Sequence, residues 1–222
     1  MTTDAAICDL VLPCRDEGPA LPALLSRIPV EFSVVVVDNG SRDDTAAVAA
    51  RLGARVVVEP VPGYGSAVHA GLLAATHDLV AVMDGDGSFD PADLLPLLAE
   101  VREGRADMAV GRRRPTGRGT WPWHARLGNA LIVAWLRRTI GMAAHDIAPM
   151  RVARRQAMLD LALQDRRFGY PVELLQAVTH AGWRISEHDV DYHPRAEGTR
   201  SKVSGSVSGT VRTARDFWRV LS

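Results

Sequence analysis

Five short apolar runs alternate with helical patterns along the first half of the chain. The runs span residues 7–12, 32–37, 55–58, 79–83 and 108–110, and each has the length of a buried strand. A helical pattern lies between each run and the next. Strands that alternate with helices in this way are typical of a doubly wound parallel sheet. The first half therefore predicts an α/β fold with helices on both faces of the sheet.

The second half opens with a basic loop, RRRPTGRGTWP, at residues 112–122. No linker separates the halves, and 222 residues with 47% hydrophobic composition suffice for one large domain. We therefore expect a single, mostly parallel α/β domain, with a first half at about 6–111 and a second half at about 112–222. The elements expected after the loop are a helix at 124–140, an unassigned segment to Val152, a helix to about Leu163, a helix at 171–180, a strand at 183–192 and a helix at 207–221.

Composition excludes several classes of protein. The 26 basic residues balance the 26 acidic ones, so we expect no nucleic-acid partner. Cys8 and Cys14 are too few for a disulfide framework and wrongly spaced for zinc. The first ten residues lack the pattern of a signal peptide, and no apolar run approaches the roughly 20 residues that span a bilayer. We expect a cytoplasmic protein, or a peripheral one on the inner face of the membrane.

Carboxylates follow three of the expected strands. Asp84 and Asp86 come directly after the run at 79–83, with only Gly85 between them. The carboxyl ends of parallel strands bind ligands in open α/β sheets, and two carboxylates so close repel unless a cation lies between them. Hard oxygen ligands suit Mg²⁺ or Mn²⁺ with a phosphate-bearing substrate. The alternative is an acidic turn in water.

The first turn excludes two familiar nucleotide sites. It reads PCRDEG, which is neither a GxGxxG dinucleotide motif nor a phosphate-binding GxxxxGK[ST] loop. It also lacks the glycine- and lysine-rich signature that a nucleotidyltransferase would need. Carboxylates here can accept hydrogen bonds from ribose hydroxyls and base N–H groups. An activated nucleoside diphosphate is the ligand that these acids favour.

Eight motifs, in order, resemble one enzyme family. VVDNGSRDDT, PGYGSAVHAGL, VMDGDGSFDP and DMAVGRRRP are similar to the donor half of family 2 inverting glycosyltransferases. RLGNAL, HDIAPMRVARRQAM, FGYPVELL and PRAEGTRSK resemble the dolichyl-phosphate mannose synthase branch, the polyprenyl-phosphate glycosyltransferases. The resemblance covers about residues 6–215 and implies a GT-A fold.

The resemblance implies a site for a UDP- or GDP-sugar and a divalent metal. Asp84 and Asp86 would hold Mg²⁺ or Mn²⁺, and Asp86 would thereby act in catalysis. Ser88 is the candidate third ligand, at a position where the mannose synthases usually carry glutamine. The residues implied to contact the nucleotide sugar are Pro13, Glu17, Asp38, Asp84, Gly85 and Asp86.

The same resemblance implies a phosphate-binding role for several basic residues. A leaving diphosphate and a phosphate acceptor both need cations, and Arg can grip phosphate in a bidentate fashion. The alternative is that these residues are solvated surface charges. The candidates for binding an acceptor phosphate are Arg113, Arg126, Arg195, Ser201 and Lys202.

Asp146 is the candidate general base or acceptor-orienting residue. It stands in His145-Asp146, where enzymes of the family that act on hydroxyls usually show an acidic pair. A phosphate acceptor is already an anion and needs little help from a base. The alternative is that Asp146 caps the turn before Ile147.

The predicted activity is transfer of a hexose from a nucleoside-diphosphate sugar to a polyprenyl phosphate. A soluble hydroxyl acceptor, or binding of nucleotide sugars without catalysis, are the alternatives. The helix expected at 207–221 is basic and amphipathic, so it would lie on an anionic membrane or pack on the domain. Trp121 and Trp123 would form an acceptor or membrane lip, or anchor the basic loop.

Overall fold

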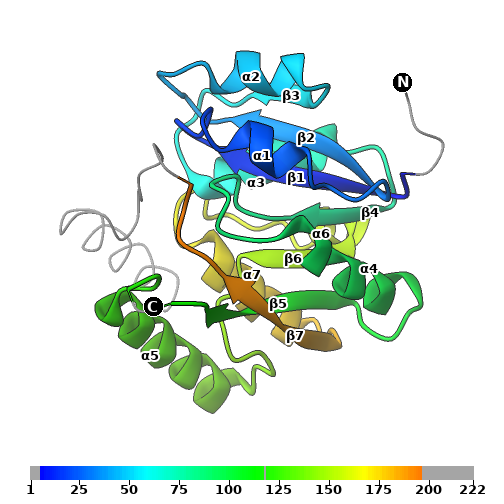
Figure 1. Ribbon diagram of the computed structural model, residues 1–222. Helices are drawn as coiled ribbons and strands as arrows, with labels where there is room; N and C mark the ends of the chain where they lie inside the picture. Colours follow the sequence, from blue (N-terminus) through cyan, green and yellow to red (C-terminus); the bar gives the residue numbers. More distant parts are fainter. Residues whose placement is uncertain (1–5, 118, 197–222) are drawn as a thin grey trace.

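A computed structural model describes residues 6–117 and 119–196 (Figure 1). The expected helix at 207–221 therefore lies outside the described residues, as do Ser201 and Lys202. The strands are β1 (Cys8–Cys14), β2 (Phe32–Asp38), β3 (Arg55–Val58), β4 (Leu79–Val82), β5 (Met108–Pro115), β6 (Met150–Arg154) and β7 (Ile185–Tyr192). The helices are α1 (Leu21–Leu25), α2 (Thr45–Arg51), α3 (Tyr64–Ala74), the 3-10 turn η1 (Pro91–Asp93), α4 (Leu94–Arg102), α5 (Trp123–Ile140), α6 (Arg155–Asp160) and α7 (Tyr170–His180).

The seven described strands form one sheet in the order β3-β2-β1-β4-β6-β5-β7. The pairs β1–β2, β2–β3, β1–β4 and β5–β7 are parallel, and β6 is antiparallel to both of its neighbours. The prediction of a single α/β domain with a mostly parallel sheet is confirmed. The two halves of the chain are interleaved, because β6 of the second half lies between β4 and β5 of the first.

Strand β6 corrects the sequence prediction for residues 150–154. This segment was expected to be unassigned to Val152 and helical beyond it. Instead, Val152 pairs with Ala81 of β4 on one side and with Ala109 of β5 on the other. Pairing on both edges outweighs the helix propensity of the run RVARRQAM. Helix α6 begins only at Arg155 and ends at Asp160, short of the expected Leu163.

Helices cover both faces of the sheet. Leu24 of α1, Val48 of α2 and Leu97 of α4 belong to the buried cluster on one face. The cluster on the other face is larger and includes side chains from α3, α5, α6 and α7. Helix α5 lies at the periphery in Figure 1 and turns Val133 and Leu136 toward the core. Within the described ranges, no helix is both long enough and apolar enough to cross a membrane.

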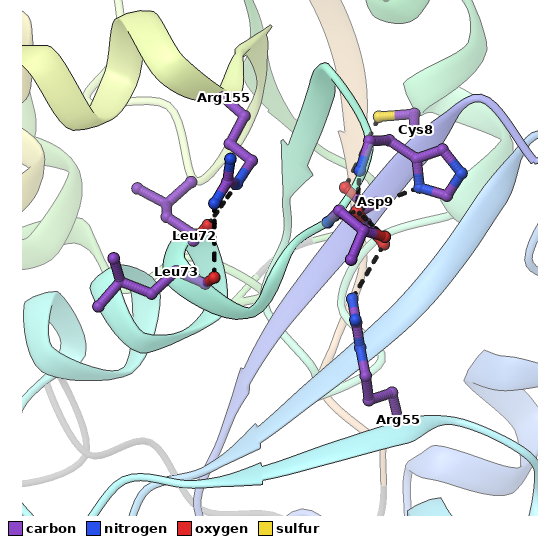
Figure 2. A network of polar contacts seen from close by, with 8 residues as sticks. Cys8, Asp9, Arg55, Leu72, Leu73 and Arg155 are labelled. Atoms are coloured by element: carbon purple, nitrogen blue, oxygen red, sulfur yellow. Dashed lines mark hydrogen bonds and ion pairs between the residues drawn. The ribbon is translucent and has the colours of Figure 1, made fainter.

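A buried carboxylate ties β1 to the connection between α3 and β4 (Figure 2). Asp9 is fully buried in β1, and it accepts backbone hydrogen bonds from Thr76 and from His77 at 2.5 and 2.8 Å. Arg55 of β3 approaches the other oxygen at 3.2 Å. Burial alone would raise the pKa of Asp9, but the hydrogen bonds from His77 and Thr76 outweigh it and hold that pKa below its usual range.

A second contact fixes the far end of helix α3. Arg155, at the start of α6, donates through Nε to the carbonyl of Leu72 at 2.9 Å (Figure 2). The last carbonyls of a helix lack partners of their own and carry partial negative charge, so a cation stabilises them. The carboxyl end of α3 is thus held by contacts from β1 and from α6. Its amino end lies at the other end of the sheet, where strands β1, β2 and β4 end.

We expect Asp9→Asn to lower the free energy of unfolding by about 2 kcal/mol, because an amide cannot satisfy all of these donors. The folded-state pKa of Asp9 lies below its unfolded value, so this stabilisation is present above about pH 4 and is lost as the pH falls through the folded pKa. Urea unfolding of both proteins between pH 3 and pH 7 measures the difference. Asp78→Asn, at a side chain 69% exposed, is the control and should change little. If the difference in free energy of unfolding between wild type and Asp9→Asn stayed the same down to pH 3, a stabilising role for the ionised Asp9 carboxylate would be contradicted.

Candidate active site

A pocket of about 310 Å³ opens at the carboxyl ends of β1, β2 and β4. Among the residues that line it are five of those predicted for the site: Pro13, Glu17, Asp84, Asp86 and Arg195. Open α/β sheets bind ligands at this edge. Residues as far apart in the sequence as Pro13 and Arg195 therefore meet at the edge where the sequence predicts a nucleotide-sugar site.

The first turn of the pocket is held by the turn that follows β2. Asp16 adopts a left-handed conformation with φ 52°, and its carboxylate accepts a hydrogen bond from the Arg42 backbone at 2.6 Å. The backbone N–H groups of Glu17 and Gly18 both donate to the Thr45 hydroxyl at 2.9 Å. These bonds fix the direction of the Glu17 side chain, which is almost fully buried beside the pocket.

Asn39, which the sequence reasoning missed, lines the pocket next to the predicted Asp38. Its side-chain amide donates to the carbonyls of Glu59 and Val61, and its oxygen accepts from Gly63 N–H at 2.8 Å. Asp38 ends β2, and its Oδ1 caps the following turn by accepting from Ser41 N–H at 2.9 Å. The polar turn DNGS was the signal, but it did not tell which of the two side chains reaches the pocket.

The glycine-rich loop before α3 packs directly on residues 165–167. A Cβ atom on Gly63 would lie 2.0 Å from the carbonyl oxygen of Arg166, and one on Gly65 would lie 2.5 Å from that of Asp165. Ser66 N–H donates to the Arg166 carbonyl at 2.8 Å. Only glycine permits this approach. The contact brings Arg167 and Phe168 of the second half to the pocket.

The Asp84-Gly85-Asp86 turn is buried against the first turn. A Cβ atom on Gly85 would lie 2.4 Å from the Cys14 sulfur, so a side chain here would push the two turns apart. Asp86 is 2% exposed, and its Oδ1 accepts a hydrogen bond from Ser88 N–H at 3.0 Å. Backbone packing therefore sets the separation of the two carboxylates.

Burial and neighbouring charges act in opposite directions on the acidic turn. Burial, and then the charge of Asp86, raise the pKa of Asp84 to about 6. Three arginines act in the opposite direction, namely Arg195, Arg151 and Arg113. They come from the segment after β7, from β6 and from β5. The turn is thus a concentrated acidic site at the meeting point of three basic segments.

Arg195 contacts the acidic turn directly. Its Nε lies 3.1 Å from Oδ2 of Asp86. The same segment lies along the turn through its backbone, because His193 N–H donates to the Ser88 carbonyl and Ala196 N–H donates to the Asp86 carbonyl. The position of Arg195 is therefore compatible with its predicted place in the site. The last described residue, Ala196, also lies beside the two carboxylates.

Arg151 is a second residue that the sequence reasoning missed. It is 2% exposed on β6, opposite Val82 of β4, and its Nε donates to the Ala148 carbonyl at 2.7 Å. Its charge acts on Asp84 and on the pocket residue Tyr64. A buried guanidinium is costly unless it is compensated, so its place beside an acidic site indicates a role there.

Asp146 is locked in a bidentate pair with Arg113. Arg113 donates from Nε to Oδ2 at 2.8 Å and from Nη2 to Oδ1 at 2.6 Å, and its backbone N–H also reaches Oδ2. Trp121 stacks on the same guanidinium, with its ring centre 4.0 Å away. Burial alone would raise the pKa of Asp146, but hydrogen bonds and charge from Arg113 hold it below its usual range. This geometry favours a positioning role over that of a general base.

The other residues predicted for the site differ in where they lie. Ser88 is fully buried, and its hydroxyl has no hydrogen-bond partner within the described ranges. Arg126 is exposed near the start of α5. Ser201 and Lys202 lie outside the described residues, so their predicted contact with an acceptor phosphate stays a prediction.

The sheet and its acidic turn define the class of protein, a glycosyltransferase of the GT-A fold. Residues 9–159 match Glycosyl transferase family 2, and the chain belongs to that family. A protein of Mycobacterium tuberculosis named as an uncharacterized glycosyltransferase is 57% identical, over 96% of this chain and 97% of its own. The polyprenol monophosphomannose synthase of Mycolicibacterium smegmatis is 31% identical, over 89% of this chain and 81% of its own.

A solved structure shares the fold. It is glucosyl-3-phosphoglycerate synthase from M. tuberculosis in complex with Mn²⁺ and UDP-glucose, with a TM-score of 0.75. The likeness covers 97% of this chain and 78% of that one, at 22% sequence identity. The predictions of a family 2 enzyme and of a GT-A fold are confirmed.

We expect Asp146→Asn to lower the free energy of unfolding by about 3 kcal/mol, because it breaks a buried ion pair and leaves Arg113 uncompensated. Chemical denaturation of the variant measures the loss. The matched control is Asp189→Asn, which breaks the exposed pair with the neighbouring Arg114 and should cost less than about 1 kcal/mol. Equal effects of the two substitutions would show that the buried pair does not hold the site together.

Proposed function

We propose that this enzyme transfers a hexose from a UDP- or GDP-sugar to a polyprenyl phosphate, with inversion at the anomeric carbon. The observation that carries the proposal is the convergence of Arg113, Arg151 and Arg195 on the acidic turn. Such a charge distribution suits two phosphate-bearing substrates, one bound through a cation and the other by arginines. The name of the M. smegmatis relative, a polyprenol monophosphomannose synthase, supports the same class of acceptor.

The donor would lie in the pocket with its nucleoside against the first turn. Pro13, Glu17 and Asn39 line that part, with Asp38 directly beside it. Carboxylate and amide oxygens accept hydrogen bonds from ribose hydroxyls and from base N–H groups. The diphosphate would then extend toward Asp84 and Asp86.

A divalent cation, Mg²⁺ or Mn²⁺, fits the residues present. Asp84 and Asp86 supply hard oxygen ligands, and burial and the charge of Asp86 raise the pKa of Asp84, so a bound cation would favour its ionised form. The hydroxyl of Ser88, buried without a partner in the described part of the chain, is available as a third ligand. When bound, the cation would neutralise the diphosphate and stabilise it as a leaving group.

The acceptor phosphate would bind on the arginine side of the pocket. Arg113 presents a guanidinium that Asp146 and Trp121 hold in place, and Arg195 lies closest to the turn. Arg126, Ser201 and Lys202 remain candidates for the same phosphate. Asp146 has both oxygens engaged by Arg113, so we assign it to orienting that arginine.

No general base is required for this acceptor. A phosphate oxygen attacks the anomeric carbon while the bond from that carbon to the diphosphate oxygen breaks, and the electron pair leaves with the diphosphate. No proton is transferred, since the phosphate is an anion at neutral pH. The arginines hold the attacking oxygen in line and exclude water, which would otherwise hydrolyse the donor.

The test is transfer of labelled sugar. Incubation with radiolabelled UDP-glucose or GDP-mannose, Mn²⁺ and a short polyprenyl phosphate should give lipid-extractable label. Phosphoglyceric acid serves as a soluble acceptor in a parallel reaction. Label on that acceptor alone would contradict the proposed acceptor class, and nucleotide binding with no turnover on any acceptor would contradict the activity.

We expect Asp86→Asn to reduce turnover by at least about 100-fold, because the substitution removes one of two charged ligands beside the leaving group. Initial rates with and without EDTA measure the effect, and circular dichroism checks the fold. Asp44→Asn, at a side chain 65% exposed, should leave the rate unchanged. Turnover that survives EDTA would exclude the metal.

A further inference from the structure

Helix α5 exposes a continuous apolar stripe. Trp123, Leu127, Leu131 and Trp135 are spaced four residues apart, so they lie on one side of the helix. Their exposed fractions are 76%, 51%, 63% and 39%. The opposite side of α5 carries the buried Val133 and Leu136. The helix therefore packs on the domain with one face and presents large apolar side chains on the other.

In the part of the chain that the structure describes, the other large exposed apolar residues are spread over several elements. Leu52, Val58 and Leu73, for example, lie on α2, β3 and α3 or directly beside them. Single exposed apolar side chains are normal on protein surfaces, whereas a contiguous apolar patch marks an interaction site. The surface of α5 defined by residues 123, 127, 131 and 135 is such a patch.

The charges of α5 indicate what covers this surface. Its sequence, WHARLGNALIVAWLRRTI, contains three arginines, Arg126, Arg137 and Arg138, and no aspartate or glutamate. Tryptophan favours the boundary between water and lipid, and a basic amphipathic helix with Trp and Leu on its apolar face lies in the plane of an anionic bilayer.

Helix α5 is also joined to the proposed acceptor site. Asn129, which faces the domain, accepts a hydrogen bond from Nη2 of Arg113 at 3.2 Å and one from the backbone of Ile147 at 3.2 Å. Trp121, just before the helix, stacks on the same arginine. A bilayer in contact with the outer face of α5 would therefore lie next to the residues that would bind a lipid-linked phosphate.

We propose that the surface formed by Trp123, Leu127, Leu131 and Trp135 docks on an anionic lipid bilayer. Two other occupants are disfavoured by charge. Residues 197–222 contain five basic and two acidic residues, so their charge would repel the arginines of α5, and so would a second copy of α5. This proposal deepens the proposed function and rests on it for its purpose, because a polyprenyl phosphate resides in a membrane.

The experiment is co-sedimentation of the full chain with phosphatidylcholine vesicles, with and without phosphatidylglycerol. Neither sugar donor nor polyprenyl phosphate is present, so the result is independent of the transfer reaction. The wild-type protein should bind the vesicles that contain phosphatidylglycerol. The double variant Leu127→Glu/Leu131→Glu should bind at least about tenfold more weakly, because two carboxylates replace apolar contacts in an anionic surface. Leu52→Glu/Leu73→Glu, of similar exposure, is the matched control and should bind like the wild type.

Three results would overturn the proposal. The first is wild-type protein that does not bind anionic vesicles. The second is binding that survives Leu127→Glu/Leu131→Glu but is lost in Trp218→Glu, which would assign docking to residues 197–222. The third is a dimer, detected by light scattering, that the Leu127→Glu/Leu131→Glu variant dissolves, which would make a second copy the occupant. If the wild-type protein gave the first result and still transferred sugar to a detergent-dispersed acceptor, this inference would be refuted and the proposed function would stand.

Discussion

The repulsion between Asp84 and Asp86 is the constraint around which the carboxyl edge of the sheet is arranged. Two carboxylates held in a buried turn destabilise it unless positive charge lies close by. Arg113, Arg151 and Arg195 provide that charge from three separate segments of the second half. Burial and the charge of Asp86 nevertheless raise the pKa of Asp84 to about 6, so a bound cation would favour its ionised form. The site is thus complete only when the second half is folded against the first.

Close backbone contacts that only glycine permits determine how near to one another the segments around the pocket lie. Gly85 lets the acidic turn approach Cys14 of β1, and Gly63 and Gly65 let the start of α3 rest on the backbone of residues 165–167. At the other end of α3, Asp9 and Arg155 fix the helix from two sides. Helix α3 is therefore held at both ends, and its amino end is a rigid wall of the pocket.

The sequence predicted most of the first half because its signals are local. Valine-rich runs, turn residues and glycine caps each fix an element within a few residues, and the strand ends then place the acids at one edge. Strand β6 escaped prediction because its identity as a strand depends on pairing with β4 and β5, which are distant in the sequence. Arg151 was missed for the same reason, since its burial beside Asp84 follows from that pairing.

Side-chain partners in the site were less predictable than its location. Asp146 was expected as a general base or as an acceptor-orienting residue, and the engagement of both its oxygens by Arg113 is a geometry that only the tertiary structure reveals. Asn39 rather than Asp38 lines the pocket, because the polar turn after β2 determines which side chain faces inward. Spacing in the sequence identifies which turns meet, and packing determines which atoms of those turns are available.

A crystal structure with Mn²⁺ and a nucleoside diphosphate tests the central claim most directly. Anomalous scattering should place Mn²⁺ at coordination distance from carboxylate oxygens of Asp84 and Asp86, in contact with the diphosphate. The base should lie against the first turn, beside Glu17 and Asn39. A diphosphate bound by the arginines alone, with no anomalous signal at the acidic turn, would contradict the account.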